Sequence, residues 1–173
     1  MTSLQMVRWP ASVGLVFFAC LLLPRAVAQT ESPPQKTNFS GRWRMVKEKS
    51  DFARATAPEA IIRVIDQRGV TMNVHTIQTM GKKTVSADIS YLLDGSEAQN
   101  ILNGHDAVSK AFWDGPALMI RTTLKFANGD EEVVTDRWEL SPDGDTLTTT
   151  SHVVTTKGEA DLKLVCVKEK PAG

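Results

Sequence analysis

The 173-residue sequence has little cysteine, a single tyrosine and no excess of charge of either sign. Its two cysteines are Cys20 and Cys166, and Cys20 lies in an N-terminal segment that the sequence marks for removal. One remaining cysteine excludes an internal disulfide, so the domain must depend on a packed core. The 20 basic and 20 acidic residues are interspersed, which excludes the basic stripe that nucleic acid requires.

The sequence also lacks the common catalytic motifs. It contains no Gly-rich phosphate loop, no Gly-x-Ser-x-Gly elbow and no His-Glu-x-x-His. The three histidines, His75, His105 and His152, have no ligand spacing among themselves and no cysteine partner. A single histidine that ligates haem is the alternative to three structural or solvated ones. We therefore predict no enzyme activity, no catalytic residue, no metal site and no cofactor.

Residues 1–28 have the three regions of a secretory signal peptide. Arg8 and the amino terminus form the positive region, residues 11–23 form an apolar run, and residues 26–28 are the small-x-small sequence Ala-Val-Ala. The run of 13 residues is shorter than the roughly 20 that span a bilayer, although a retained anchor is the alternative. We predict cleavage after Ala28, export to the periplasm or the medium, and no stable membrane insertion afterwards.

The rest of the chain divides into a linker, one domain and a tail. Residues 29–38 are polar, contain two prolines and have too few apolar side chains to pack. Residues 39–169 form the single predicted domain, and residues 170–173 form the tail.

Apolar and polar residues alternate with a period close to two through most of that domain, which is typical of half-buried strands. In one segment Ile61, Arg63 and Ile65 share a face. Glycine turns such as Asp114-Gly115 separate the segments. The ten predicted strands are residues 40–47, 60–67, 70–76, 84–91, 97–103, 107–113, 118–126, 133–140, 146–155 and 161–168.

These short strands and the near absence of helix predict an all-β fold. We expect an antiparallel up-and-down meander barrel of about 8–10 strands, with at most one short helical turn near residues 50–59. A sandwich is the alternative. Closure favours the barrel, because it removes edge strands that would otherwise aggregate.

The start of the domain resembles the first strand of the calycin barrels, the lipocalins and fatty-acid-binding proteins. The sequence Phe39-Ser40-Gly41-Arg42-Trp43 is followed by Lys49-Ser50-Asp51-Phe52. With Trp113-Asp114-Gly115, Asp136-Arg137-Trp138 and Ser141-Pro142-Asp143-Gly144, the pattern over residues 39–169 is similar to small exported lipocalin-like bacterial proteins of unassigned function.

The resemblance implies a barrel that Phe39, Gly41 and Trp43 close at one end, with a ligand in its interior. One family feature has no counterpart here. Fatty-acid-binding proteins carry a paired Arg-x-Tyr near their C-terminal end, whereas Arg137 is followed by Trp138 and Glu139.

The faces predicted to point inward mix large side chains with small ones, and small side chains leave room for a pocket. We expect the pocket near the small residues 107–111 and the threonines around residue 149. The alternative for the tryptophans is a purely structural place in the core. The predicted ligand-binding residues are Tyr91, Ser109, Ala111, Trp113, Asp136, Trp138 and Thr149.

Asp136 shares its face with apolar neighbours, including Val134 and Trp138. A buried carboxylate costs several kcal/mol unless it is paired. Arg42, Arg44 or a ligand cation is a candidate partner. The alternative is a carboxylate at the barrel rim, in water.

Two functions follow from this sequence. The first is an exported barrel that binds a small apolar or amphipathic ligand in its interior, without catalysis. The second is a filled barrel with a structural or envelope-stress role that acts through its outer surface.

Overall fold

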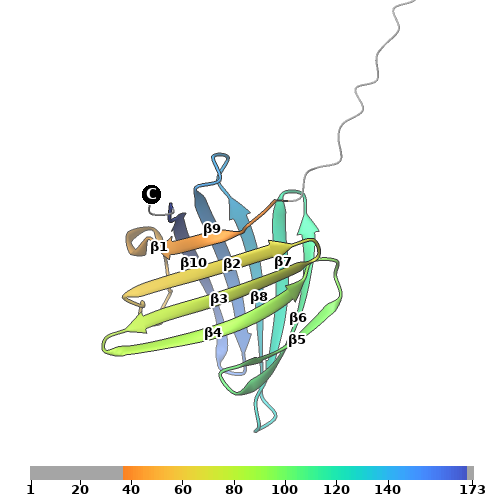
Figure 1. Cartoon of the computed structure of the whole chain (residues 1–173). Coiled ribbons are helices and arrows are strands. Elements are labelled where there is room, and N and C mark those ends of the chain that lie inside the picture. The colour runs from red at the N-terminus through yellow and green to blue at the C-terminus, as the bar shows by residue number, and fades with distance from the viewer. Residues whose placement is uncertain (1–36, 171–173) are drawn as a thin grey trace, which may run out of the picture. The chain divides into compact units, whose positions relative to one another are not determined.

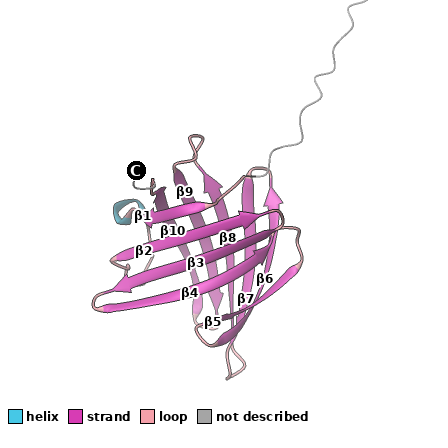
Figure 2. Cartoon of the chain, in the orientation of Figure 1, coloured by secondary structure: helices cyan, strands magenta, loops and turns pink. Residues whose placement is uncertain are grey.

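Ten β-strands account for most of the chain that the computed structural model describes, which is residues 37–170 (Figures 1 and 2). The predicted signal peptide, its cleavage site and the last three residues lie outside the described residues. The strands are β1 (Gly41–Met45), β2 (Ala60–Arg68), β3 (Thr71–Met80), β4 (Lys83–Leu92), β5 (Glu97–Leu102), β6 (His105–Asp114), β7 (Ala117–Lys125), β8 (Glu131–Leu140), β9 (Thr146–Thr155) and β10 (Gly158–Lys168).

The strands form one antiparallel sheet in the order β4-β3-β2-β1-β10-β9-β8-β7-β6-β5. Every strand pairs with its neighbour in sequence except where β1 pairs with β10 and where β4 meets β5. Strands β1 to β4 run across the front of the view in Figure 1, and β6 to β10 run behind them at a steep angle. The prediction of an up-and-down meander barrel is confirmed.

The last gap in the barrel, between β4 and β5, is bridged by a side chain. Asn100 of β5 accepts a hydrogen bond from the backbone N–H of Ser90 at 2.8 Å, and its amide donates to the Ser90 carbonyl at 3.0 Å. An asparagine side chain carries the same donor and acceptor groups as a peptide unit. It therefore replaces one rung of the missing ladder.

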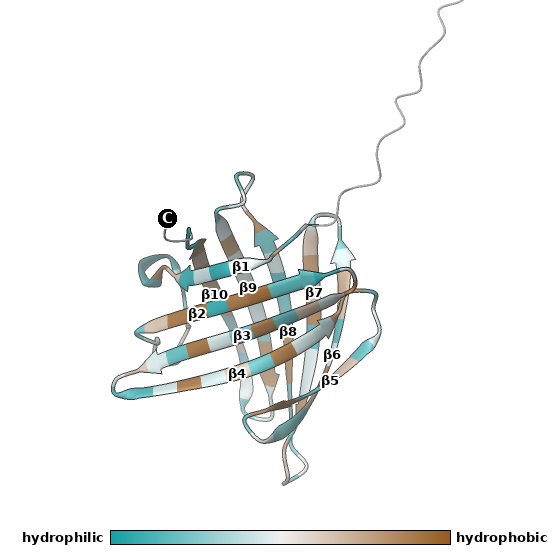
Figure 3. Ribbon diagram, in the orientation of Figure 1, coloured by the Kyte–Doolittle hydropathy of each residue, from teal (hydrophilic) through white to brown (hydrophobic). Residues whose placement is uncertain are grey.

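Alternating hydropathy explains why these segments are strands and which face lies inside. In β7, Ile120 and Thr122 point inward and are buried, whereas Arg121 between them points outward and is exposed. The same alternation appears as brown and teal bands along the strands in Figure 3. A period of two puts one set of side chains on each face of a strand. The brown set supplies the core.

One end of the barrel, here called the plugged end, is closed by Phe39 and Trp43, neither of which is exposed. The indole Nε1 of Trp43 donates to the Phe39 carbonyl at 2.9 Å. The Phe39 ring stacks on Trp113 with centroids 6.1 Å apart and meets Trp138 edge-on at 5.9 Å. These aromatic contacts pack the plugged end with buried rings.

The helical turn expected near residues 50–59 lies earlier, as a 3-10 helix at Lys47–Lys49. Ser50 and Asp51 are extended against β10 instead. The Ser50 hydroxyl accepts a hydrogen bond from the Val165 N–H at 3.0 Å, and Asp51 forms an isolated bridge with Lys163. Among residues 37–170 no helix is long and apolar enough to cross a membrane.

The inward-facing rows become more exposed toward the other end of the barrel, here called the open end. Along β4 the exposed fraction rises from 5% at Tyr91 to 42% at Val85. Along β9 the buried Leu147 and Thr149 give way to half-buried Ser151 and Val153. Strands β3, β8 and β10 show the same gradient. Water therefore reaches the inward face from the open end and not from the plugged end.

Candidate functional site

Arg63 is a charged side chain inside the barrel. It lies on the inward face of β2 between Ile61 and Ile65, which are both buried. Its Nη1 donates to the Thr149 hydroxyl at 3.2 Å, and its guanidinium carbon lies 5.0 Å from the centroid of the Trp138 ring. Its Nε is buried without a hydrogen-bond partner. A guanidinium over an aromatic face is a favourable cation–π contact.

Asp136 faces Arg63 from β8, in register with Ile120 on β7 and Ser151 on β9. Burial raises the pKa of its carboxyl, and the Ser151 hydroxyl, the Arg63 charge and the Trp138 indole N–H act in the opposite direction. The hydroxyl and the indole lie near the carboxyl, although neither completes a hydrogen bond of ordinary geometry. The residue as a whole is half-buried, because its face opens toward the open end.

The structure resolves the two interpretations of Asp136 in favour of the interior, but with a different partner from those expected. Arg42 and Arg44 both bind Glu169, with N–O distances of 2.6 and 3.3 Å. Alternation on β1 turns these arginines outward when Trp43 turns inward. Arg63, on the next strand, supplies the positive charge instead.

Tyr91 completes this group from β4. Its ring meets Trp138 edge-on, with centroids 6.4 Å apart, and the residue is 5% exposed. Burial strongly raises the pKa of its hydroxyl; the charge of Asp136 adds to the rise and Arg63 opposes it. The phenol therefore stays neutral and keeps its proton as a donor.

Four of the predicted ligand-binding residues thus gather around Arg63, namely Tyr91, Asp136, Trp138 and Thr149. Three do not. Ser109 of β6 shares a hydrogen bond of 2.8 Å with Thr122 of β7. Ala111, also on β6, is buried opposite Ile120 of β7, the strand that separates it from Asp136. Trp113 stacks on Phe39 at the plugged end. Strand β6, which carries the small residues, is therefore packed against its neighbours and does not line the site. The polar group around Arg63 lies between β2, β4, β8 and β9.

Arg63 was not among the predicted site residues. The sequence does contain a signal for it, because an arginine between two isoleucines at a spacing of two stands on a buried face. The continuous run of apolar residues around it, Ile61, Ile62, Val64 and Ile65, obscures which face that is.

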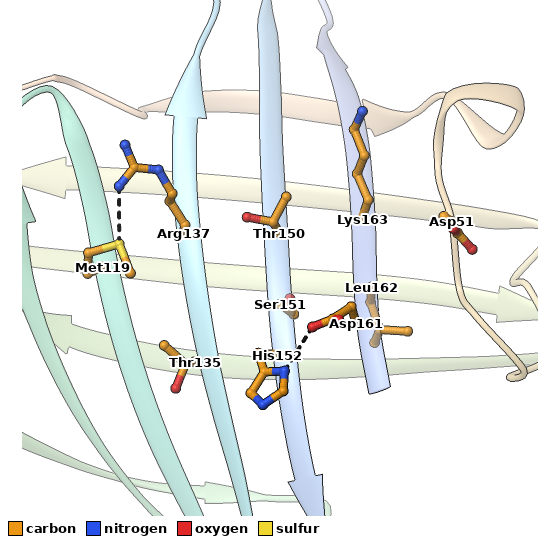
Figure 4. Close-up of a pocket in the computed structure, with 10 residues that line it drawn as sticks. All are labelled: Asp51, Met119, Thr135, Arg137, Thr150, Ser151, His152, Asp161, Leu162 and Lys163. Atoms are coloured by element: carbon orange, nitrogen blue, oxygen red, sulfur yellow. Dashed lines mark hydrogen bonds and ion pairs between the residues drawn. The ribbon is translucent and has the colours of Figure 1, made fainter. Parts of the chain in front are cut away.

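A groove of about 430 Å³ lies on the outer surface of β7 to β10 (Figure 4). Arg137, His152 and Asp161 are among the side chains that line it. Two of its charged groups already have partners: Arg137 binds Asp114 at 2.6 Å, and His152 binds Asp161 at 2.8 Å. The groove lies on the opposite face of the sheet from Arg63 and Asp136. We favour the interior group, because it contains two buried donors without a hydrogen-bond partner, Arg63 Nε and Trp138 Nε1; the third such donor, Trp113 Nε1, lies at the plugged end.

Two of the three histidines form pairs with aspartates, both outside the barrel. His75 lies 2.7 Å from Asp88, and His152 lies 2.8 Å from Asp161. Within residues 37–170 no group of three or more His, Cys, Asp or Glu side chains is placed to hold a metal ion.

No protein-family model matches the sequence, and no curated protein matches it. Solved structures match in fold. A SAHS protein from Ramazzottius varieornatus has a TM-score of 0.56 at 16% identity, covering 80% of this chain and 100% of its own. Caenorhabditis elegans lipid binding protein 8 has a TM-score of 0.53 at 14% identity, and the match covers 76% of this chain and 95% of that protein. Human cRBP IV has a TM-score of 0.50 at 16% identity, and the match covers 77% of this chain and 99% of that protein. The predicted resemblance to the calycin barrels is confirmed for the fold.

Proposed function

We propose that the protein is an exported, non-catalytic barrel that binds a small amphipathic molecule in its interior. One observation carries the proposal. The Nε of Arg63 and the Nε1 of Trp138 are buried donors without a hydrogen-bond partner, and the guanidinium lies against the indole. A buried unsatisfied donor costs about 1–3 kcal/mol. A bound molecule with an oxygen acceptor would remove that cost at both atoms.

The exposure gradient supports a route to these donors. The inward rows of β4 and β9 are buried at the plugged end; toward the open end the row of β9 becomes half-buried and that of β4 becomes exposed. An amphipathic molecule entering from the open end would place its polar group near Arg63 and its apolar body along the half-buried Ile89, Val134 and Val153.

The comparisons support binding at the level of analogy. One structure of similar fold is named a lipid binding protein, and a shared fold raises the expectation of a similar use without fixing it. Export rests on the signal-peptide features of residues 1–28. The alternative is a filled barrel that acts through its outer surface; the dense plugged end around Trp43 and Trp138 favours it.

Binding of the fluorescent probe N-phenyl-1-naphthylamine tests the proposal. We expect saturable binding with one probe per barrel and a blue shift of its emission, as in an apolar site. Ala87→Trp places a bulky side chain on the half-buried inward face of β4 and should weaken binding by about tenfold or more. Its matched control is Ser86→Trp, one residue away on the outward face.

Equal loss in both variants, or no saturable binding in the wild type, would contradict interior binding. Native mass spectrometry of the protein purified from its own host provides a second measurement. A bound molecule of constant mass, absent from Ala87→Trp, supports the carrier. Persistent absence of any bound species supports the filled barrel.

A further inference from the structure

The polar group inside the barrel contains one positive and one negative side chain. Arg63 enters from β2 and Asp136 from β8, on the same face as Trp138, and the charge of Arg63 acts to lower the pKa of the Asp136 carboxyl. They form no direct ion pair, and Arg63 instead donates to Thr149 and lies over Trp138. A ligand group that reaches Arg63 therefore also meets the field of Asp136.

The neighbouring groups define which oxygen and hydrogen atoms a ligand must supply. Arg63 Nε is a buried donor without a hydrogen-bond partner, and Trp138 Nε1 lies near the Asp136 carboxyl without completing a hydrogen bond to it. Asp136 accepts hydrogen bonds when ionised, and neutral Tyr91 offers a further hydroxyl. A carbonyl or hydroxyl oxygen satisfies the two free donors, and a ligand hydroxyl can also donate to Asp136.

An anionic ligand fits this arrangement poorly. A carboxylate would gain from Arg63 but would be brought close to Asp136. The ionised form of Asp136 would repel it strongly, because little water screens the two charges there. An uncharged group avoids that repulsion and still satisfies the donors. Asp136 therefore acts as a filter, in addition to any hydrogen bond it accepts.

We propose that the barrel selects amphipathic molecules with an uncharged carbonyl or hydroxyl end, and that Asp136 excludes anionic amphiphiles such as free fatty acids from Arg63. This inference rests on the proposed interior binding and adds the class of ligand. It also assigns Asp136 a role in specificity, since it cancels the charge of Arg63 within the site.

The test compares two probes that differ only in charge, a dansyl-labelled undecanoic acid and the matching dansyl-labelled undecanamide. Both are titrated at neutral pH against the wild type. We expect the amide to bind more tightly than the acid by about tenfold or more. Asp136→Asn should strengthen binding of the acid by about the same factor and change binding of the amide by less than about threefold.

Two further variants test whether the effect depends on the position of the removed negative charge and whether Arg63 is the group that attracts the acid. Glu132→Gln removes the same charge from the same inward face of β8, two inward positions nearer the open end, where water screens it. It should leave the ratio of the two affinities unchanged. Adding Arg63→Gln to Asp136→Asn should abolish the gain in acid binding.

The outcomes separate this inference from the proposed function. If neither probe binds any variant, interior binding itself fails. If both probes bind the wild type equally, or if Asp136→Asn strengthens both equally, the charge filter fails and the carrier remains. Circular dichroism establishes that each variant is folded. If Asp136→Asn does not fold, the ratio of affinities in the wild type still decides the question.

Discussion

The indole N–H of Trp43 donates a hydrogen bond to the carbonyl of Phe39, 2.9 Å away, with both residues fully buried. The bond ties the segment before β1 to β1 itself across the plugged end. It explains why a tryptophan, and not merely a large apolar residue, stands at this position. A phenylalanine would fill most of the space but would leave the Phe39 carbonyl without its partner.

Trp43→Phe should therefore lower the free energy of unfolding by about 2–3 kcal/mol, the sum of a lost hydrogen bond to a buried carbonyl and a small void. Urea unfolding followed by circular dichroism measures the change. Phe112→Leu on the exposed outer face of β6 is the control and should stay within about 0.5 kcal/mol of the wild type. A comparable loss in both variants would refute the special role of the indole.

Gly41 precedes Trp43 with a φ of 145°, in a region that side chains disfavour. A Cβ atom added there would lie 2.7 Å from the Cε of Lys168, whose ammonium lies over the Trp43 ring. Gly41→Ala should destabilise the protein by about 1–3 kcal/mol, mainly through backbone strain. Thermal unfolding measures this loss.

Testing Gly41→Ala in a Lys168→Ala variant separates the backbone strain at residue 41 from the steric contact between the added Cβ and the lysine side chain. Removing the lysine removes the contact with the added Cβ but leaves the backbone conformation of Gly41 unchanged. Most of the loss should persist in the double variant when it is compared with Lys168→Ala alone. Full recovery there would show that the side-chain contact, and not the φ angle, required glycine.

The sequence predicted the fold well because the barrel is made of local signals. Alternation identified the ten strands, and glycine turns such as Asp114-Gly115 implied that sequential strands pair. The helical turn ends before Asp51, which instead forms a β-bridge with Lys163. That pairing joins residues over a hundred positions apart, which a local pattern does not reveal.

The site was predicted less completely, for the same reason. Tyr91, Asp136, Trp138 and Thr149 were identified by the face on which they stand, and they gather in the structure around one point. Arg63 was missed, because β2 is apolar on both faces and its inward face is fixed only by its register with Trp43 in β1. Conversely, Ser109 faces inward as expected but is paired with Thr122.

The Asn100 bridge predicts that β4 and β5 separate more easily when its amide is removed. Asn100→Ala loses both hydrogen bonds to Ser90, and exposed hydrogen bonds are worth about 0.5–1.5 kcal/mol each. We expect faster hydrogen exchange at the Ser90 amide and its neighbours in β4, with little change in β8 or β9. Mass spectrometry of exchanged peptides measures both.

Asn100→Asp refines this test. The aspartate still accepts from the Ser90 N–H but no longer donates to the Ser90 carbonyl. Exchange at that amide should therefore remain closer to the wild type than in Asn100→Ala. Unchanged exchange in both variants would show that side-chain bridging does not hold the gap.

The pKa of Asp136 predicts how stability depends on pH. Burial raises this pKa above the ordinary value of 3.8, so the folded state binds the proton more tightly than the unfolded state does. The protonated carboxyl therefore stabilises the folded state relative to the ionised one. This contribution to the free energy of unfolding is fully present when the pH is below the ordinary pKa, and it is lost as the pH rises through the folded-state pKa. At neutral pH, above the ordinary value, burial of this carboxyl therefore lowers the stability of the folded state.

Asp136→Asn removes that cost while keeping the size of the side chain. The variant should therefore be more stable than the wild type at pH 7, and the difference should shrink as the pH falls toward 3.8, where the wild-type carboxyl is also neutral. Urea unfolding at a series of pH values measures this. A variant less stable than the wild type at pH 7 would mean that attraction to Arg63 outweighs desolvation, and the carboxylate would then stabilise the folded barrel.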